Sequence, residues 1–139
     1  MSSVFTKIIN GELPGHFVWK DEVCVSFLSI NPIANGHTLV VPLLEIDHWL
    51  DLPQDVNTHL MQIAQIIGEG QMTAFNPLRV GMIIAGLEVP HTHLHVIPMQ
   101  GMEDLDFSRA TAFVDQGKLA ENAQILRDAI ISNGYTTGF

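Results

Sequence analysis

Hydrophobic residues with helical spacing occur in two long segments of the chain. In residues 53–75 the apolar positions follow the i, i+3, i+4, i+7 pattern of an amphipathic helix, and Pro53 stands where a first-turn proline is tolerated. The same pattern returns in residues 118–132 and predicts a last helix, with Gly134 as its C-terminal cap. A short apolar stretch at residues 4–10 predicts one or two further helical turns.

Shorter apolar runs bounded by turn residues predict strands. Residues 18–20 and 23–28 flank a polar turn and predict a hairpin. Strands are also predicted at residues 37–41, 80–85 and 89–97, and prolines at positions 42 and 98 end the first and the last of these. Because neighbouring strands resemble hairpins and the helices are segregated, we expect one α+β domain over residues 1–139, with an antiparallel sheet.

Composition narrows the classes of function. The chain has 139 residues, a hydrophobic fraction of 47% and a net charge of −9, and its six Lys and Arg residues are scattered. A nucleic-acid polymer binds a basic stripe, so no DNA or RNA partner is expected. No segment approaches the roughly 18 apolar residues of a membrane span, and no signal peptide is recognisable. A lone Cys24 cannot form an internal disulfide, which favours a cytoplasmic location.

Three of the seven histidines stand at alternate positions, as His91, His93 and His95. Alternate side chains share one face of a strand, whereas the side chains at i and i+2 of a helix diverge. The spacing therefore predicts a strand that presents three imidazoles on one face.

Residue chemistry alone leaves three interpretations of this row open. The rings can be satisfied polar groups on a half-exposed strand, although such crowding without a function is unusual. They can contribute to a metal site, but at ~3.3 Å per residue the outer Cα atoms lie ~13 Å apart, which is awkward for one zinc bound by all three. They can also serve nucleophilic catalysis, because a neutral imidazole attacks phosphorus and is displaced again.

Residues 91–97, HTHLHVI, resemble the His-φ-His-φ-His-φ-φ motif of the histidine triad (HIT) family of nucleotide hydrolases and nucleotidyl transferases, where φ is apolar and Thr92 fills the first φ position. Residues 5–14 and 25–42 are similar to two further blocks of that family. The resemblance implies a HIT fold with about five strands, a long central helix and a C-terminal helix. It also implies a homodimer with one continuous sheet, in which the tail at 135–139 lies near the partner's site.

The resemblance implies a role for each histidine. His93 would attack an α-phosphorus and form a nucleotidyl-histidine intermediate, and His95 would hydrogen-bond a phosphate or bridging oxygen and assist the leaving group. His91 would orient His93, and His37 would pair with His91. The residues at the substrate-contacting positions of the family are Phe27, Ser29, Ile30, Leu39 and Leu87.

The chain departs from the family pattern at several of these positions. Zinc-binding members carry two cysteines and a histidine where this chain has Ser3, Thr6 and Glu45, so neither a metal nor another cofactor is expected. Leu87 replaces a glutamine that donates to the phosphate or leaving group in many members. Ser29 replaces an acidic residue that commonly holds the ribose hydroxyls.

Two functions follow from these comparisons of motifs. The first is an enzyme that hydrolyses a phosphoramidate or a dinucleoside polyphosphate, or transfers a nucleoside monophosphate from it. The expected nucleotide is a purine nucleotide. The second is a nucleotide-binding or interaction protein on a HIT scaffold with weak or lost catalysis, which the changes at Leu87 and Ser29 favour. A nucleotidyl adduct that depends on His93 would distinguish the two.

Overall fold

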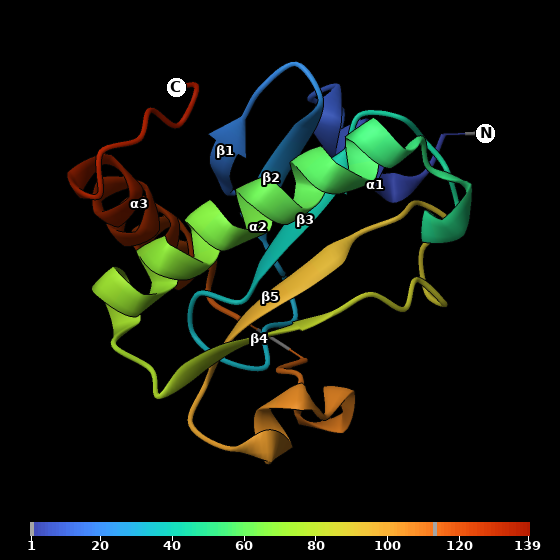
Figure 1. The fold of residues 1–139 in the computed structure, drawn as a ribbon. Coiled ribbons are helices and arrows are strands. Elements are labelled where there is room, and N and C mark those ends of the chain that lie inside the picture. The colour runs from blue at the N-terminus through green and yellow to red at the C-terminus, as the bar shows by residue number, and fades with distance from the viewer. Residues whose placement is uncertain (1, 113) are drawn as a thin grey trace.

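The computed structural model describes residues 2–112 and 114–139, and it has the predicted α+β architecture (Figure 1). Five antiparallel strands form one sheet in the order β1-β2-β3-β5-β4. The strands are β1 (Phe17–Lys20), β2 (Cys24–Leu28), β3 (Thr38–Pro42), β4 (Arg79–Ile83) and β5 (Leu94–Met99). The helices are α1 (Val4–Ile9), α2 (Gln54–Phe75) and α3 (Gln116–Ser132), with 3-10 turns η1 (Trp49–Asp51), η2 (Met102–Leu105) and η3 (Phe107–Arg109).

Strand alternation divides the interior into two clusters. On β2 and β3, Cys24, Leu28 and Val40 face a large core beneath α2 and α3. The intervening positions, such as Phe27 and Leu39, face a smaller cluster beneath α1. Both helix patterns of the sequence are therefore confirmed, because the apolar stripes of α2 and α3 are buried in the larger core.

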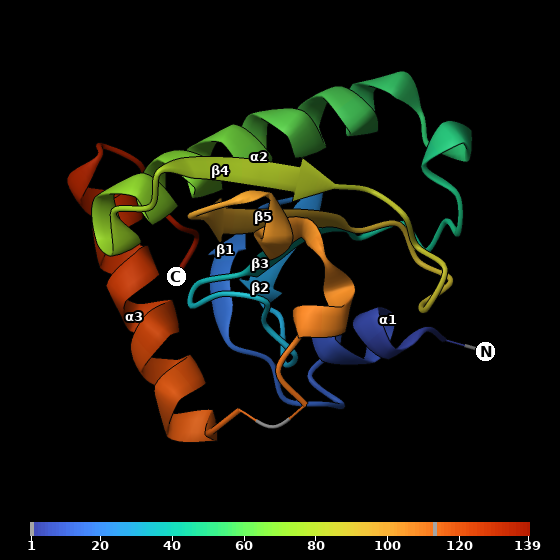
Figure 2. The same cartoon turned by 90° about the horizontal axis from the view of Figure 1, so that it is seen from below.

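The two faces of the sheet carry different elements. Figure 2 shows α2 along one face, whereas α1 and the turns η2 and η3 lie on the opposite face. The second face is thus covered only by short elements, and it holds the cavity described below.

Strand β5 differs from its prediction at both ends. It begins at Leu94, three residues after His91, and it continues through Pro98 to Met99. Pairing with β3 covers only Leu94 to Val96, and the rest of β5 pairs with β4. Pro98 has no N–H to donate, but it lies beyond the stretch of β5 that pairs with β3. No hydrogen bond between β3 and β5 is therefore lost.

The C-terminal tail returns to the edge of its own sheet. Gly134 follows α3 with a φ of +100°, the left-handed conformation typical of a helix end. The N–H of Lys20 on β1 then donates to Thr137 O at 2.9 Å, and Phe139 packs near Phe17. Among the described residues, no helix has both the length and the apolar character that a bilayer crossing requires.

Candidate active site around the histidine cluster

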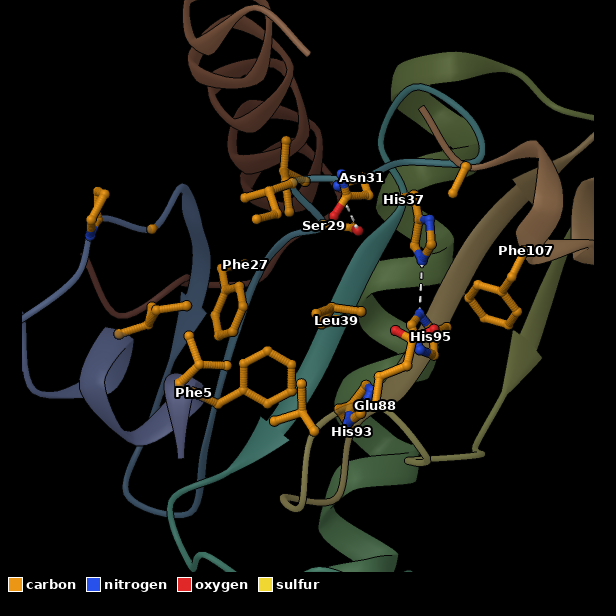
Figure 3. Close-up of a pocket in the computed structure, with 18 residues that line it drawn as sticks. Phe5, Phe27, Ser29, Asn31, His37, Leu39, Glu88, His93, His95 and Phe107 are labelled. Carbon is orange, nitrogen blue, oxygen red and sulfur yellow. Dashed lines mark hydrogen bonds between the residues drawn. The ribbon is translucent and has the colours of Figure 1, made fainter. Parts of the chain in front are cut away.

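A cavity of about 380 Å³ opens between α1, the ends of β2 and β3, the histidine segment and η3 (Figure 3). Its volume is at the lower end of the range for small-molecule sites. One part is apolar and is walled by Phe5, Phe27 and Leu39. The other part holds the imidazoles of His93 and His95.

His93 has one ring nitrogen fixed as a donor. Its Nδ1 lies 2.7 Å from the carbonyl oxygen of His91. A carbonyl only accepts, so Nδ1 carries the proton and Nε2 of the neutral ring carries a lone pair. The pKa of His93 is lowered by burial, although the hydrogen bond to His91 O and the charge of Glu88 act the other way. The ring is therefore a neutral imidazole on the cavity wall.

His37 and His95 form a hydrogen-bonded pair with a definite direction. The N–H of Ile33 donates to His37 Nδ1 at 3.1 Å, so the proton of the neutral ring is on Nε2. This Nε2–H donates to His95 Nδ1 at 2.9 Å, which leaves the proton of His95 on its own Nε2 (Figure 3). The prediction that His37 pairs with His91 is therefore wrong. The β3–β5 register sets Leu39 opposite His95 and makes His37 a diagonal neighbour of His95 on the same face.

Burial keeps this pair neutral. Desolvation, together with a smaller effect of the neighbouring imidazoles, lowers the pKa of His37 to about 4 and that of His95 to about 3. Near neutral pH, His95 presents an N–H donor and His93 presents a lone pair. Their ring centroids are 4.9 Å apart. A free imidazole lone pair and an imidazole N–H donor thus share one end of the cavity.

His91 is fully buried and does not line the cavity. Its Nε2–H donates to Pro42 O at 2.7 Å, and its Nδ1 accepts the hydroxyl proton of Ser3 at 2.7 Å. Only its carbonyl oxygen contacts His93. The expectation of three rings on one strand is wrong for His91 and His93, because Thr92 donates its N–H to Ile46 O and this segment precedes β5.

The structure brings most predicted substrate residues to the cavity. Phe27, Ser29, Ile30 and Leu39 line it. Leu87 does not: its side chain is 97% exposed and lies at a separate shallow hollow beside Asp47 and His48.

Sequence reasoning missed several residues of the cavity wall. Phe5 packs edge-on against the ring of His93 at 4.9 Å between centroids, and Phe107 packs edge-on against His95 at 4.8 Å. Phe5 lies in a motif of the family resemblance and could have been found there. Phe107 lies in a 3-10 turn without hydrophobic periodicity, so no sequence signal marked it.

The charges around the cavity are few. Glu88 at its rim is exposed, and no Lys or Arg belongs to the described residues that line it. The carboxylate of Glu88 is in solvent, but it lies near enough to His93 to oppose part of the lowering of the His93 pKa by burial.

A second cluster of titratable groups lies away from the cavity. Asp21, Cys24 and His59 have potential ligand atoms within 4.8 Å of one another. Both carboxylate oxygens of Asp21 already accept hydrogen bonds: Oδ1 from the N–H groups of Val23 and Cys24, and Oδ2 from His59 at 2.7 Å and Trp19 at 2.8 Å. Burial raises the pKa of Cys24, so the thiol stays protonated. The cluster is explained as a link between the β1–β2 hairpin and α2.

Comparisons with known proteins show which family and which fold this chain resembles. The model of the HIT domain family matches residues 10–102. An uncharacterised HIT-like protein of Borreliella burgdorferi is 34% identical over 76% of this chain and 81% of its own length. The adenosine 5′-monophosphoramidase HNT1 of Saccharomyces cerevisiae is 33% identical over 68% of this chain and 61% of its own length. Among solved structures, a zinc-bound histidine triad family protein of Mycobacterium smegmatis superposes with a TM-score of 0.81, at 26% identity and 96% coverage of both chains.

Proposed function

The chain belongs to the HIT domain family, and from this premise we propose that it hydrolyses or transfers a nucleoside monophosphate through a covalent intermediate on His93. One observation carries the proposal. Hydrogen bonds occupy both ring nitrogens of His37 and of His91, and the Nδ1 atoms of His93 and His95. The Nε2 of His95 carries a proton, so the one free lone pair of these four rings is on His93 Nε2, at the cavity.

The reaction is two in-line displacements at the α-phosphorus. In the first, His93 Nε2 forms a bond to phosphorus while the bond from phosphorus to the leaving group breaks, and the leaving group departs with the electron pair. In the second, water attacks the nucleotidyl-histidine, His93 is released with its lone pair restored, and the proton of the water passes to solvent. An acceptor hydroxyl or amine in place of water would give transfer.

His95 acts in this scheme as a hydrogen-bond donor. Its pKa of about 3 means that the ring is neutral, and a neutral imidazole does not give up its remaining proton near pH 7. Its Nε2–H therefore stabilises charge on a phosphate oxygen, as an oxyanion-hole donor does. An amine leaving group that takes its proton from solvent needs no further acid from the cavity.

The apolar part of the cavity fits the nucleoside. Phe27, Leu39 and Phe5 would pack against a base, which we propose to be a purine, with Ile30 at the edge. Ser29 would contact a ribose hydroxyl. Its Oγ accepts the N–H of Asn31 at 3.2 Å and keeps its proton available as a donor.

Charge favours a phosphoramidate over a dinucleoside polyphosphate. A polyphosphate leaving group carries several negative charges, and the described lining offers it Glu88 and no Lys or Arg. A phosphoramidate leaves as an amine, which an exposed carboxylate tolerates or attracts. The yeast relative is named for an activity of this kind, which supports the same choice.

The test is a rapid-quench reaction with adenosine 5′-phosphoramidate at neutral pH, followed by intact mass spectrometry without acid. We expect an adenylyl adduct on the wild type, and loss of both adduct and turnover by at least about 10³-fold in His93→Ala. His48→Ala, at an exposed histidine outside the cavity, is the matched control and should retain both. Binding of AMP without adduct or turnover would instead support the nucleotide-binding protein.

We further propose a cytoplasmic homodimer. The family resemblance supports the dimer, and the edge strand β4 offers a free side for pairing with a second chain. The free, buried Cys24 supports a reducing compartment. Sedimentation velocity over a range of concentrations tests the oligomeric state, and a monomer at all concentrations would contradict it.

A further inference from the structure

Four polar residues meet behind the histidine cluster, at the start of α1. Ser3 and Thr6 come from α1 and its N-cap, Glu45 follows β3, and His91 precedes β5. Ser3 Oγ lies 2.7 Å from His91 Nδ1, and Glu45 Oε1 lies 2.6 Å from both Ser3 N and Thr6 Oγ1. Segments more than 80 residues apart in sequence are thus joined by one network.

Each proton in this network has one direction. His91 Nε2 donates to Pro42 O, so Nδ1 must accept, and the donor is the hydroxyl of Ser3. Ser3 Oγ in turn accepts the N–H of Thr6 at 3.0 Å as the N-cap of α1. Thr6 gives its own hydroxyl proton to the carboxylate of Glu45, which cannot donate in return. The directions are compatible, because Ser3 Oγ accepts the N–H of Thr6 with a lone pair and gives its own proton to His91.

The family resemblance implies a zinc site at the positions of this network in zinc-binding members. The M. smegmatis protein is zinc-bound. By the family resemblance, Ser3, Thr6 and Glu45 stand at the positions where zinc-binding members carry two cysteines and a histidine. Structural zinc sites are built from thiolates and imidazoles. Only Glu45 and His91 are zinc-type ligands here, and the hydroxyls of Ser3 and Thr6 are neutral donors already used in hydrogen bonds. The residues present do not fit a tetrahedral zinc centre.

We propose that Ser3, Thr6 and Glu45 are positioning residues that fix the ring of His91 through this hydrogen-bond network. They hold the ring of His91 between Ser3 and Pro42. The carbonyl of the same residue then receives His93 Nδ1–H at 2.7 Å, which aims Nε2 at the cavity. The inference rests on the proposed function only for its predicted effect on kcat. The predicted effect on the position of the His93 ring does not depend on that function.

The same network fixes the wall of the cavity. Ser3 and Thr6 flank Phe5, whose ring packs edge-on against both His91 and His93. Loss of the bond from Ser3 to His91 would leave α1 held to the histidine segment mainly by this packing, and would loosen the contact between them. Misplacement of a reacting group by about 1 Å costs on the order of 10²-fold in rate, so a partial loosening should cost about 10-fold.

The test separates positioning from helix capping. Ser3→Ala removes both the cap and the donor to His91, whereas Ser3→Gly keeps most of the cap and loses the donor. Ser3→Thr keeps both the cap and the donor to His91, and it is the matched control. We expect kcat to fall about 10-fold in Ser3→Ala and in Ser3→Gly with little change in KM, and to stay within about 2-fold of wild type in Ser3→Thr. A normal kcat in Ser3→Gly would overturn the inference and leave a capping role only.

A spectroscopic measurement keeps the inference testable if the enzyme activity is absent. In ¹⁵N-imidazole NMR spectra of the full chain, we expect Ser3→Gly to move the Nδ1 resonance of His91 and also the Nδ1–H resonance of His93, which Ser3 does not contact. Ser3→Thr should leave both in place. A shift confined to His91 would overturn the coupling. Failure of the proposed function would show differently, as a wild type that forms no adduct while the two resonances still move together.

Discussion

The burial of His37 and His95 makes the fold sensitive to mild acid. In the unfolded chain each ring takes up a proton as the pH falls below its ordinary pKa of 6.5. In the folded chain, burial lowers the pKa to about 4 for His37 and about 3 for His95, so both stay neutral. Between these values the unfolded state binds more protons, and the free energy of unfolding therefore decreases as the pH falls.

The size of the effect follows from the number of protons. Each ring contributes up to about 1.4 kcal/mol per pH unit within the window, so the two together remove about 2.5 kcal/mol between pH 6 and pH 5. The pKa values of His91 and His93 are also lowered by burial and act in the same direction. This is a large part of the roughly 5–15 kcal/mol that stabilises a domain of this size.

Urea unfolding at pH 6.0 and pH 5.0, followed by intrinsic fluorescence, measures this loss directly. His37→Gln keeps an N–H near His95 but removes one titrating ring, and it should reduce the loss by about 1.2 kcal/mol per pH unit. Gly134→Ala, which strains a left-handed residue without altering a titrating group, is the control for lower stability alone and should keep the wild-type loss. A wild-type loss below about 1 kcal/mol would refute the reasoning, because the rings would then accept protons in the folded state.

Three further substitutions test other parts of the structure. Glu88→Gln should lower the pKa of His93 by removing a negative charge, so the acid limb of kcat/KM should move to lower pH, and an unchanged profile would contradict this. Phe107→Ala should cost about 1–3 kcal/mol in urea unfolding and raise KM, because it uncovers an imidazole of the cavity; equal stability would argue against the packing. Gly36→Ala should cost about 2 kcal/mol, since φ is +88° and a Cβ would overlap the ring that ends α2. Gly134 also has a positive φ, but an added Cβ would meet no atom within 4 Å, so Gly134→Ala should cost only about 1 kcal/mol.

The helices could be predicted because their burial repeats along the chain, and most strands because they are short apolar runs bounded by turn residues. The stripes of α2 and α3 need only local spacing, and the tight turn between β1 and β2 is set by Asp21. The start of β5 could not be predicted in this way. Residues 91–93 have strand-like alternation, but Thr92 bonds the loop at Ile46 through both its N–H and its hydroxyl, and only a long-range contact decides that.

The partner of His37 depends on a register that sequence does not specify. Alternation indicates which face a side chain takes, but sliding β3 along β5 by two residues keeps the face and changes the neighbour. The observed register brings His37 to His95, whereas the resemblance placed it with His91. Leu87 illustrates a related limit. Its place in the motif suggested a contact with substrate, but the loop before the triad turns its side chain to solvent.

The family resemblance and the hydrogen bonds lead to His93 by independent routes. The resemblance selects the middle histidine by position, and it would do so whatever the rings contact. The hydrogen bonds select His93 by elimination, because it is the ring that keeps a free lone pair at the cavity. Three of the atoms that fix the rings, Ile33 N, Pro42 O and His91 O, belong to the backbone, so a change of side chain does not remove them. Ser3 is an exception, because its side-chain hydroxyl lies 2.7 Å from His91 Nδ1, closer than Thr6 Oγ1 at 3.5 Å. Substitution of Ser3 is expected to alter the proposed nucleophile, His93, without contacting it, and for that reason Ser3 is the most informative position to vary.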